Sequence, residues 1–223
     1  MAALVALSSV AAMPAHAGKK KAPSKVVIGT DAADDWGMNV DSTIQPIGDA
    51  LGMEIVEASI EAADAKTVNF IITLNSLPPN GGTPEFVRYT YDFVVNGTAY
   101  ELDGKWLNYT RGACDPTSTQ CPPPRDPGTQ PFLLRGKCGT HPQVSNLTVC
   151  EELGLFQATF DTAAKTITIP VPLEAIKAKS GTKIMPGTNP TFGGTVVAIT
   201  SAYVSNASMP LDSLAGTKTF TIP

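Results

Sequence analysis

The sequence predicts an all-β protein, an antiparallel β-sandwich of the jelly-roll or immunoglobulin-like kind with a disulfide-stapled loop insertion. Three observations predict it. Apolar and polar residues alternate with a period of two in several short runs, turn residues separate these runs, and no series of long helices alternates with the strands. Because 43% of the 223 residues are hydrophobic, the chain can bury one sizeable core. We expect a single domain over residues 26–223.

The clearest strand signals lie in the first half of this domain. Residues 68–74 and 87–95 both alternate apolar with polar side chains. Asn96-Gly97 follows, and residues 98–102 alternate again. Asn-Gly between two alternating runs is the strongest short signal of a β-hairpin, because both residues accept positive φ. The pattern therefore predicts two strands joined by a tight turn at Asn96-Gly97.

The second half of the domain shows the same features with one exception. Residues 156–160, 166–171, 195–202 and 220–222 are alternating or β-branched runs that predict strands. Residues 172–178 (PLEAIKA) are the exception, because proline at the first turn and good helix formers after it predict a short helix.

The N-terminus reads as an export signal. Residues 2–14 are apolar and uncharged, and Ala15-His16-Ala17 follows as an A-x-A cleavage pattern. We expect residues 1–17 to be a signal peptide, residues 18–25 a basic flexible leader, and the protein to be secreted. No apolar run reaches the roughly 18–20 residues of a transmembrane helix, so no membrane insertion is expected. A net charge of -4 argues against nucleic acid as a partner.

Residues 104–150 hold all four cysteines and many prolines, and we expect a stapled loop insertion there. An even number of cysteines in an exported chain favours disulfides. Zinc is the alternative, but the C-x6-C and C-x11-C spacings differ from those of zinc ribbons. Of three possible connectivities we favour Cys114–Cys121 with Cys138–Cys150, because local pairing closes the shortest loops.

Catalytic motifs are scarce, and we expect no enzymatic activity. A Ser-His-Asp or Cys-His mechanism needs a histidine. His16 lies in the predicted signal peptide and His141 in the cysteine-rich segment, with no G-x-S-x-G motif nearby. A hydrolase with two acidic catalysts is a further alternative, but no pair of acids stands out.

Two groups of residues are candidates for binding. Aromatic side chains on the loops of a sandwich stack on sugar rings or anchor a protein partner, which makes Trp36, Trp106 and Tyr109 candidate ligand contacts. The alternative is that the tryptophans pack inside the fold. Five aspartates lie within residues 31–49 without a lysine or arginine, and flexible oxygen ligands of this kind suit Ca²⁺. The alternative is a solvated acidic loop.

Several loose motifs occur in an order that resembles a known family. They are D-x-x-D-D at residues 31–35, G-D at 48–49, M-E-I-V-E-A-S-I at 53–60, I-I-T-L at 71–74, T-I-T-I-P-V-P-L-E-A-I at 166–176 and G-T-K-I at 181–184. The chain resembles the DOMON-like β-sandwiches related to glucodextranase C-terminal domains and family 9 carbohydrate-binding modules. The resemblance implies a jelly-roll-like sandwich that binds sugars, or haem in some branches, often with a structural calcium near its start. It implies Asp31, Asp34, Asp35 and Asp49 as the metal ligands.

These expectations lead to one function and one alternative. The leading expectation is a secreted, non-enzymatic binding module whose partner is an extracellular glycan or a cell-surface component. The alternative is a structural or adhesive exoprotein that binds a protein partner through the cysteine-rich loop. Beyond a structural calcium, no cofactor is expected.

Overall fold

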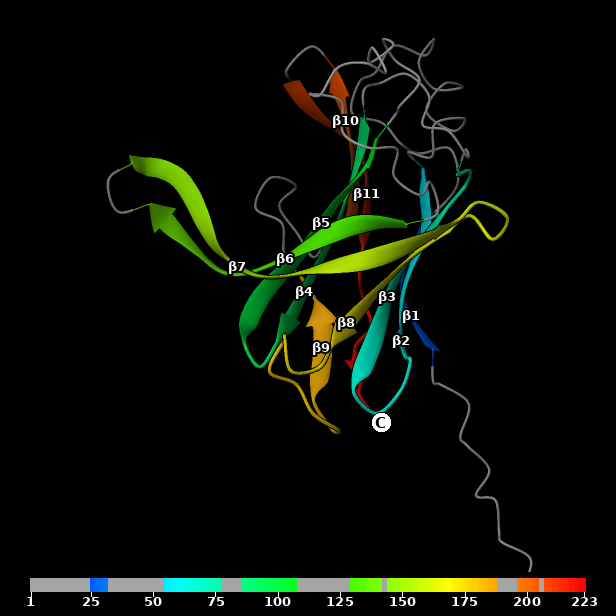
Figure 1. Ribbon diagram of the computed structural model, residues 1–223, viewed down its shortest axis with the longest axis vertical. Helices are drawn as coiled ribbons and strands as arrows, with labels where there is room; N and C mark the ends of the chain where they lie inside the picture. The colour runs from blue at the N-terminus through cyan, green and yellow to red at the C-terminus, as the bar shows by residue number, and fades with distance from the viewer. Residues whose placement is uncertain are drawn as a thin grey trace, which may run out of the picture.

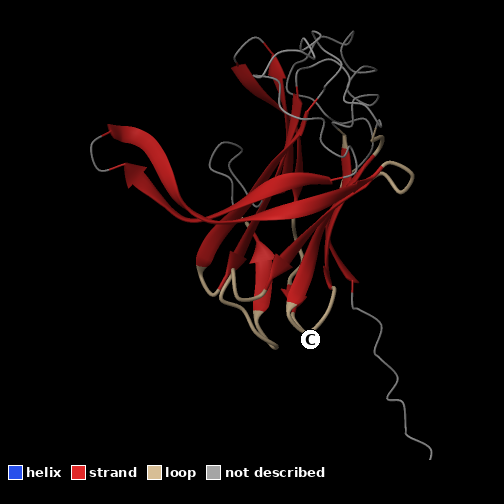
Figure 2. Cartoon of the chain, viewed as in Figure 1, coloured by secondary structure: helices blue, strands red, loops and turns tan. Residues whose placement is uncertain are grey.

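The computed structural model describes residues 25–31, 54–77, 86–107, 129–141, 144–187, 196–204 and 207–223. Throughout these ranges the secondary structure is β-strand, with turns and no helix (Figure 2). In chain order the strands are β1 (Lys25–Thr30), β2 (Ile55–Ala62), β3 (Thr67–Leu74), β4 (Phe86–Val95), β5 (Thr98–Leu107), β6 (Thr129–His141), β7 (Val144–Asp161), β8 (Thr166–Pro172), β9 (Lys183–Pro186), β10 (Val196–Val204), β11 (Ala207–Ala215) and β12 (Phe220–Thr221). The predicted all-β class is confirmed.

The strands form one sheet that curls on itself until it is nearly a closed barrel (Figure 1). The order is β1-β2-β3-β8-β7-β6-β5-β4-β10-β11, and β9 joins β4 to β12. Every pair is antiparallel, as predicted. Two facing sheets were expected, whereas here one sheet is continuous because β4 pairs with β5 along one edge and with β10 and β9 along the other.

The barrel is drawn together where the chain after β11 meets β1. The backbone N–H groups of Thr217 and Lys218 donate to the carbonyl of Ile28 at 3.0 and 3.2 Å. Gly29 lies so close to the carbonyl of Ala215 that a Cβ atom would overlap with it. Glycine at position 29 therefore permits the two ends of the sheet to approach one another.

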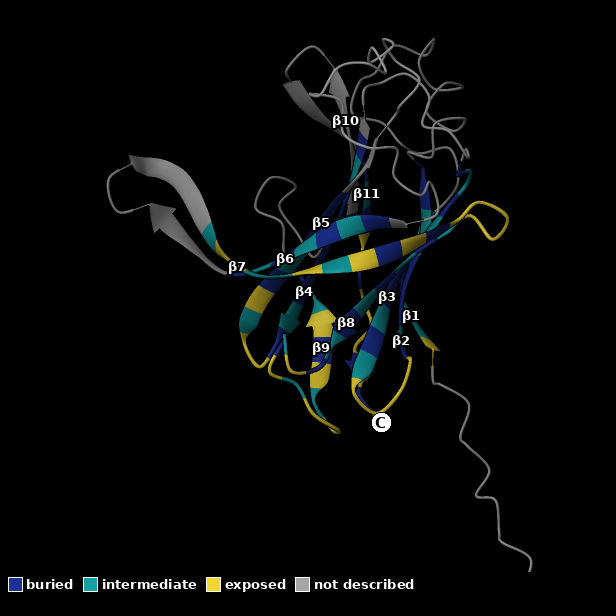
Figure 3. Cartoon of the chain, in the orientation of Figure 1, coloured by how far each residue is buried: buried dark blue, intermediate teal, exposed yellow. Residues whose placement is uncertain are grey.

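Aromatic side chains fill the inside of the barrel, and burial alternates along the strands (Figure 3). The Phe70 ring lies 4.4 Å from that of Phe93 and 5.1 Å from that of Tyr91, measured between centroids. Phe93 also stacks on Tyr100 at 5.3 Å. Because β4 contributes alternate residues to this cluster, the period of two that predicted the strand also places its core face.

Strand β8 is paired fully on one edge and only in part on the other. It pairs with β3 along its whole length, but with β7 only from Thr166 to Thr168. Leu74 N donates a hydrogen bond to Lys165 O, and Leu173 N donates one to Lys66 O. The backbone N–H and C=O groups of the odd-numbered residues of β8 therefore point toward β3. Pro170 and Pro172 therefore face the side that β7 has left, where no ladder bond needs their missing N–H groups.

Two predicted features are corrected. The segment expected as a loop insertion is partly strand, because β5 continues to Leu107 and β6 and β7 form a long hairpin from Thr129 onward. The helix expected at residues 172–178 is a series of turns, in which Ala175 N bonds Pro172 O and Lys177 N bonds Glu174 O. A segment this short does not sustain a helix by itself, and its apolar side chains pack onto the barrel instead.

Candidate functional site

The connection between β8 and β9 closes one end of the barrel and forms a rigid platform there. Leu173 and Ile176 point into the core and are 6% and 0% exposed. The carbonyl of Ile176 accepts a hydrogen bond from the Tyr100 hydroxyl at 3.4 Å, and that of Lys177 accepts one from the Asn96 amide at 3.3 Å. The apolar residues of this segment thus fix the positions of its polar neighbours.

Further backbone bonds hold the second half of the connection. Gly181 N donates to Ile222 O at 2.8 Å, and Ile222 N donates to Thr182 O at 3.0 Å. Lys179 N donates to the Thr182 hydroxyl at 3.1 Å, while Thr182 N donates back to Lys179 O at 2.9 Å. These reciprocal bonds fix the backbone of Lys179 although its side chain is exposed.

The turn between β2 and β3 lies beside this platform. Ala63 N and Asp64 N both donate to Thr67 O, and the Asp64 carboxylate accepts a bond of 2.7 Å from Lys66 N. The carbonyl of Lys66 in turn accepts the bond from Leu173 N. Turn and platform are therefore joined directly through their backbones.

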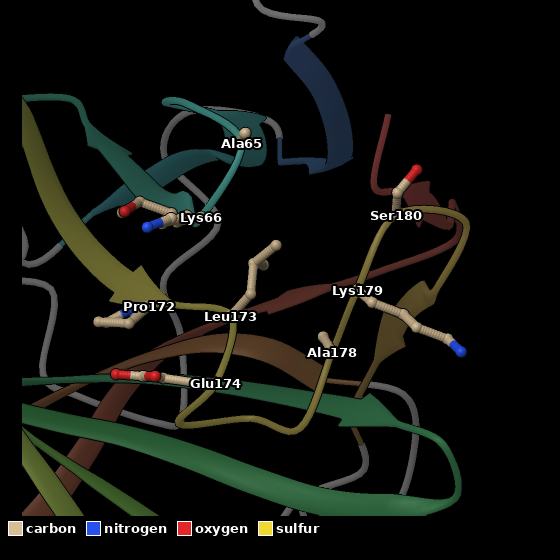
Figure 4. Close-up of a pocket in the computed structure, with 9 residues that line it drawn as sticks. Ala65, Lys66, Pro172, Leu173, Glu174, Ala178, Lys179 and Ser180 are labelled. Carbon is tan, nitrogen blue, oxygen red and sulfur yellow. The ribbon is translucent and has the colours of Figure 1, made fainter.

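A hollow of about 630 Å³ lies between the turn and the platform. Figure 4 shows Lys66, Pro172 and Glu174 on one side of it, Lys179 and Ser180 on the other, and Leu173 and Ala178 between them. Its lining residues carry ammonium, carboxylate and hydroxyl groups around a small apolar floor, although the Lys179 ammonium and the Ser180 hydroxyl point away from Leu173 and Ala178 in Figure 4. Such a lining can hydrogen-bond a polar ligand while a nonpolar face of that ligand rests on the floor.

A second hollow of about 470 Å³ adjoins the first. It is lined by the turn at Asn96-Gly97, by residues 179–183 and by Met185. Lys179 and Ser180 line both hollows, so the two share one wall. Among the charged side chains of the two linings, three are lysines (Lys66, Lys179, Lys183) and one is glutamate (Glu174).

A separate cluster of charges ties β4, β5 and β6 together on the outside of the barrel. Arg88 forms two bonds to the Asp103 carboxylate, at 2.6 and 2.9 Å, and Arg135 contacts Asp103 at 2.8 Å and Glu101 at 2.9 Å. Burial lowers the pKa of Arg88, but the hydrogen bond and charge of Asp103 outweigh it and raise that pKa. Two cations match two anions here, which suits a structural tie better than a ligand site.

The structure describes only some of the residues that the sequence singles out for binding. Trp36, Tyr109, Asp34, Asp35 and Asp49 lie outside the described residues. Trp106 lies on β5 opposite Val87, but its side chain lies outside the described part. Asp31 follows β1, and its backbone N–H donates to Val56 O at 3.1 Å. The predicted aromatic contacts and the calcium set therefore stay predictions.

The structure describes the positions of one predicted cysteine pair and not those of the other. Cys114 and Cys121 lie outside the described residues. Cys138 and Cys150 lie on β6 and β7, where Gly136 pairs with Glu151 and Gly139 with Val149. This register sets the backbones of Cys138 and Cys150 across from each other, and the described part of the chain contains no free cysteine.

Sequence reasoning missed the two hollows. Lys66 is more than a hundred residues from Lys179 and Lys183, and only the fold brings the turn that carries it beside them. The one local signal was the run I-K-A-K-S-G-T-K-I at residues 176–184, where three lysines fall within seven residues.

The chain matches no protein-family model, no curated protein and no solved structure. The described residues contain no group of three or more histidine, cysteine, aspartate or glutamate side chains that could hold a metal ion. They also contain no helix long and apolar enough to cross a membrane. The two hollows beside the β8–β9 connection are the candidate site in the described part of the chain.

Proposed function

We propose that this protein is a secreted, non-enzymatic binding module for extracellular glycan or other cell-surface material. We place its ligand in the hollow between the β2–β3 turn and the β8–β9 connection. The observation that carries the proposal is the rigid, polar wall of that hollow, where charged and hydroxyl-bearing side chains stand on a backbone fixed by hydrogen bonds.

This arrangement suits a saccharide for two reasons. Sugar hydroxyls both donate and accept hydrogen bonds, and the lining supplies partners of both kinds in Thr67, Glu174 and Ser180. The fixed backbone also reduces the entropy lost on binding, so a shallow site can still bind with useful affinity. The resemblance to sugar-binding DOMON-like sandwiches points to the same ligand class and stays a hypothesis about family.

A glycan-array screen of the full chain tests the function, and one substitution tests the site. Ser180→Trp places a bulky ring at an exposed position that lines both hollows and should abolish binding of any glycan found on the array. Gln157→Trp, on the exposed outer face of β7, is the matched control. An array without any bound glycan would contradict the function. Full binding by Ser180→Trp would show that the glycan binds outside the hollow.

The aromatic residues form a second set of proposed contacts. Trp36, Trp106 and Tyr109 are candidates for stacking on sugar rings, and stacking contributes mainly through the ring face. Alanine substitutions at these positions, measured on the same glycan, separate a stacking platform from the hollow. A loss of binding confined to these three variants would favour the aromatic platform.

The alternative function is structural or adhesive, with a protein partner held by the cysteine-rich segment. The observation that favours it is the β6–β7 hairpin, because the C-terminal part of β6 and the N-terminal part of β7 extend away from the barrel (Figure 1). We propose that Cys138 and Cys150 form a disulfide, because the register on either side of them sets their backbones across from each other, and that Cys114 pairs with Cys121. Non-reducing peptide mapping tests both pairs, and crossed pairs would contradict them.

We also retain calcium as a proposed structural ion, bound by Asp31, Asp34, Asp35 and Asp49. Clustered carboxylates repel each other unless a cation neutralises them, so binding would stabilise the fold. The measurement is the melting temperature of the full chain in excess EDTA and then in millimolar calcium. A Tm that does not change would contradict the calcium site and favour the alternative, in which these aspartates form a solvated acidic loop.

A further inference from the structure

The two hollows carry a charge opposite to that of the whole chain. The protein has 16 basic and 20 acidic residues, a net charge of -4. The linings of the hollows hold three lysines and one glutamate, a local charge of +2. A positive concave surface on an acidic protein raises the local concentration of anions and steers them to it.

The three lysines are distributed over both hollows. Lys66 lines the first hollow, Lys179 lies on the wall shared by both, and Lys183 lines the second. Lys66, Lys179 and Lys183 are all exposed. Their ammonium groups therefore remain hydrated and able to exchange water for a ligand, unlike Arg88 and Arg135, which are held by Asp103 and Glu101.

The glutamate and the hydroxyl groups limit which anion fits. Glu174 lies on the same side of the first hollow as Lys66, with Pro172 between them (Figure 4), and would repel a densely charged ligand. Thr67, Ser180 and Thr182 supply neutral hydrogen-bonding groups between the lysines. This alternation of positive and neutral polar groups matches a chain that carries spaced negative charges among many hydroxyls.

We propose that the ligand of this site is an acidic polysaccharide, which lies across both hollows with its carboxylates at Lys66, Lys179 and Lys183. The inference rests on the proposed function and adds the ligand class and the contacts. Sugar hydroxyls bond Thr67, Ser180 and Thr182, and the small apolar floor at Leu173 meets a ring face. Because the ion pairs are exposed, binding weakens as salt increases.

The test measures binding of the full chain to polygalacturonate by isothermal titration calorimetry, at low and at high salt. Uncharged dextran is the comparison polysaccharide. Lys66→Gln, Lys179→Gln and Lys183→Gln are each expected to weaken binding about twofold to fivefold, and the triple variant about tenfold or more. Lys165→Gln is the matched control, because this exposed lysine lies at the opposite end of β8, roughly 20 Å away.

The outcomes separate the inference from the function on which it rests. Binding to polygalacturonate that falls with salt and with the lysine substitutions supports the inference. Equal binding to dextran, or a triple variant that binds polygalacturonate like the wild type, overturns the inference and leaves a binding module. Tighter binding to phosphatidylglycerol vesicles than to polygalacturonate also overturns it, in favour of a lipid surface. No binding to polygalacturonate, to dextran or to any glycan of the array overturns both.

Discussion

The hairpins β4–β5 and β6–β7 are built in opposite ways within one sheet. β4 and β5 pair along all ten residues of each strand without a register shift, around the turn at Asn96-Gly97. β6 and β7 are longer, and their register shifts at three places. Each shift changes which residues oppose one another and increases the local twist. Both hairpins contribute buried residues to the core, but part of the irregular one leaves the barrel and extends outward (Figure 1).

Side-chain pattern fixes the regular hairpin, whereas backbone irregularity shapes the other one. Along β4 the odd-numbered residues from Val87 to Val95 are all buried. Among the β7 residues whose burial is described, from Cys150 onward, the alternation runs from Gly154 to Asp161, and before it Leu153 is an extra residue at a bulge. Five predictions test how far this contrast extends to stability.

The largest effect is expected from removing a core ring in either hairpin. Phe93→Ala in β4 and Phe132→Ala in β6 each remove a side chain that is at most 1% exposed, at a cost of about 3–5 kcal/mol in the free energy of unfolding. Chemical denaturation measures both. Equal losses would show that the irregular hairpin is as firmly part of the core as the regular one, and a small loss at Phe132 would contradict this.

The next effect is an alkaline loss of stability that originates in β4. Burial raises the pKa of Tyr89 and Tyr91 well above the ordinary value near 10. In the unfolded chain both tyrosines ionise above about pH 10, whereas in the folded chain they keep their protons. The unfolded state therefore binds fewer protons, and the free energy of unfolding falls as pH increases above 10, by about 1.4 kcal/mol per pH unit for each tyrosine.

Denaturant titrations between pH 9 and pH 11 measure this slope. Tyr91→Phe should halve it, because only Tyr89 then contributes. Lys183→Gln is a control that removes an exposed titratable group instead of a buried one. A slope that is the same in wild type and Tyr91→Phe would show that other groups cause the alkaline loss.

A third prediction concerns the irregular hairpin. If Cys138 and Cys150 are bridged, the bond closes a loop of roughly a dozen residues and stabilises the fold by roughly 2–3 kcal/mol. Cys150→Ser should lose this amount, and Cys138→Ser and the double variant should lose the same amount. Additive losses in the double variant, measured by urea denaturation, would show that the two cysteines act independently.

The same contrast explains which parts of the fold were predictable from sequence. The alternation of residues 87–95 and the Asn-Gly turn each depend on local geometry, so β4 and β5 were predicted within a few residues. Gly136, Cys138 and Gly139 interrupt the alternation in β6, and its bulges shift the period, so β6 read as a loop. The helix at residues 172–178 failed because burial of Leu173 and Ile176 outweighed a weak local preference.

The candidate site was less predictable than the fold for a related reason. A hollow forms between segments that the topology brings together. No local sequence pattern predicts the hydrogen bond between Leu173 and Lys66, because these residues are far apart in the chain. Each of its lysines, taken alone in the sequence, is typical of a solvent-exposed surface residue. They become a site only when the β2–β3 turn lies beside the β8–β9 connection, and the sandwich expected from sequence did not specify that neighbourhood.

A fourth, smaller effect is expected at the turn of the regular hairpin. Gly97 has a φ of 77°, and a Cβ atom there would meet nothing within 4 Å. Gly97→Ala therefore costs only backbone strain, about 1 kcal/mol in the free energy of unfolding. Gly97→Asn is the control, because asparagine accepts positive φ more readily and should cost less. Equal costs for the two would contradict backbone strain as the cause.

The smallest effect is expected on the outer face of β7. Leu155 is 61% exposed although it lies opposite Leu133 on β6. Leu155→Gln should change the free energy of unfolding by less than about 0.5 kcal/mol, because little apolar surface is removed from water at this position when the chain folds. Leu134 follows Leu133 on β6 and points to the buried face. Leu134→Gln is the contrasting variant and should be strongly destabilising. A loss at Leu155 that approaches the loss at Leu134 would mean that the outer face of this hairpin is covered in solution, and sedimentation of the wild type would then show whether a second copy of the chain covers it.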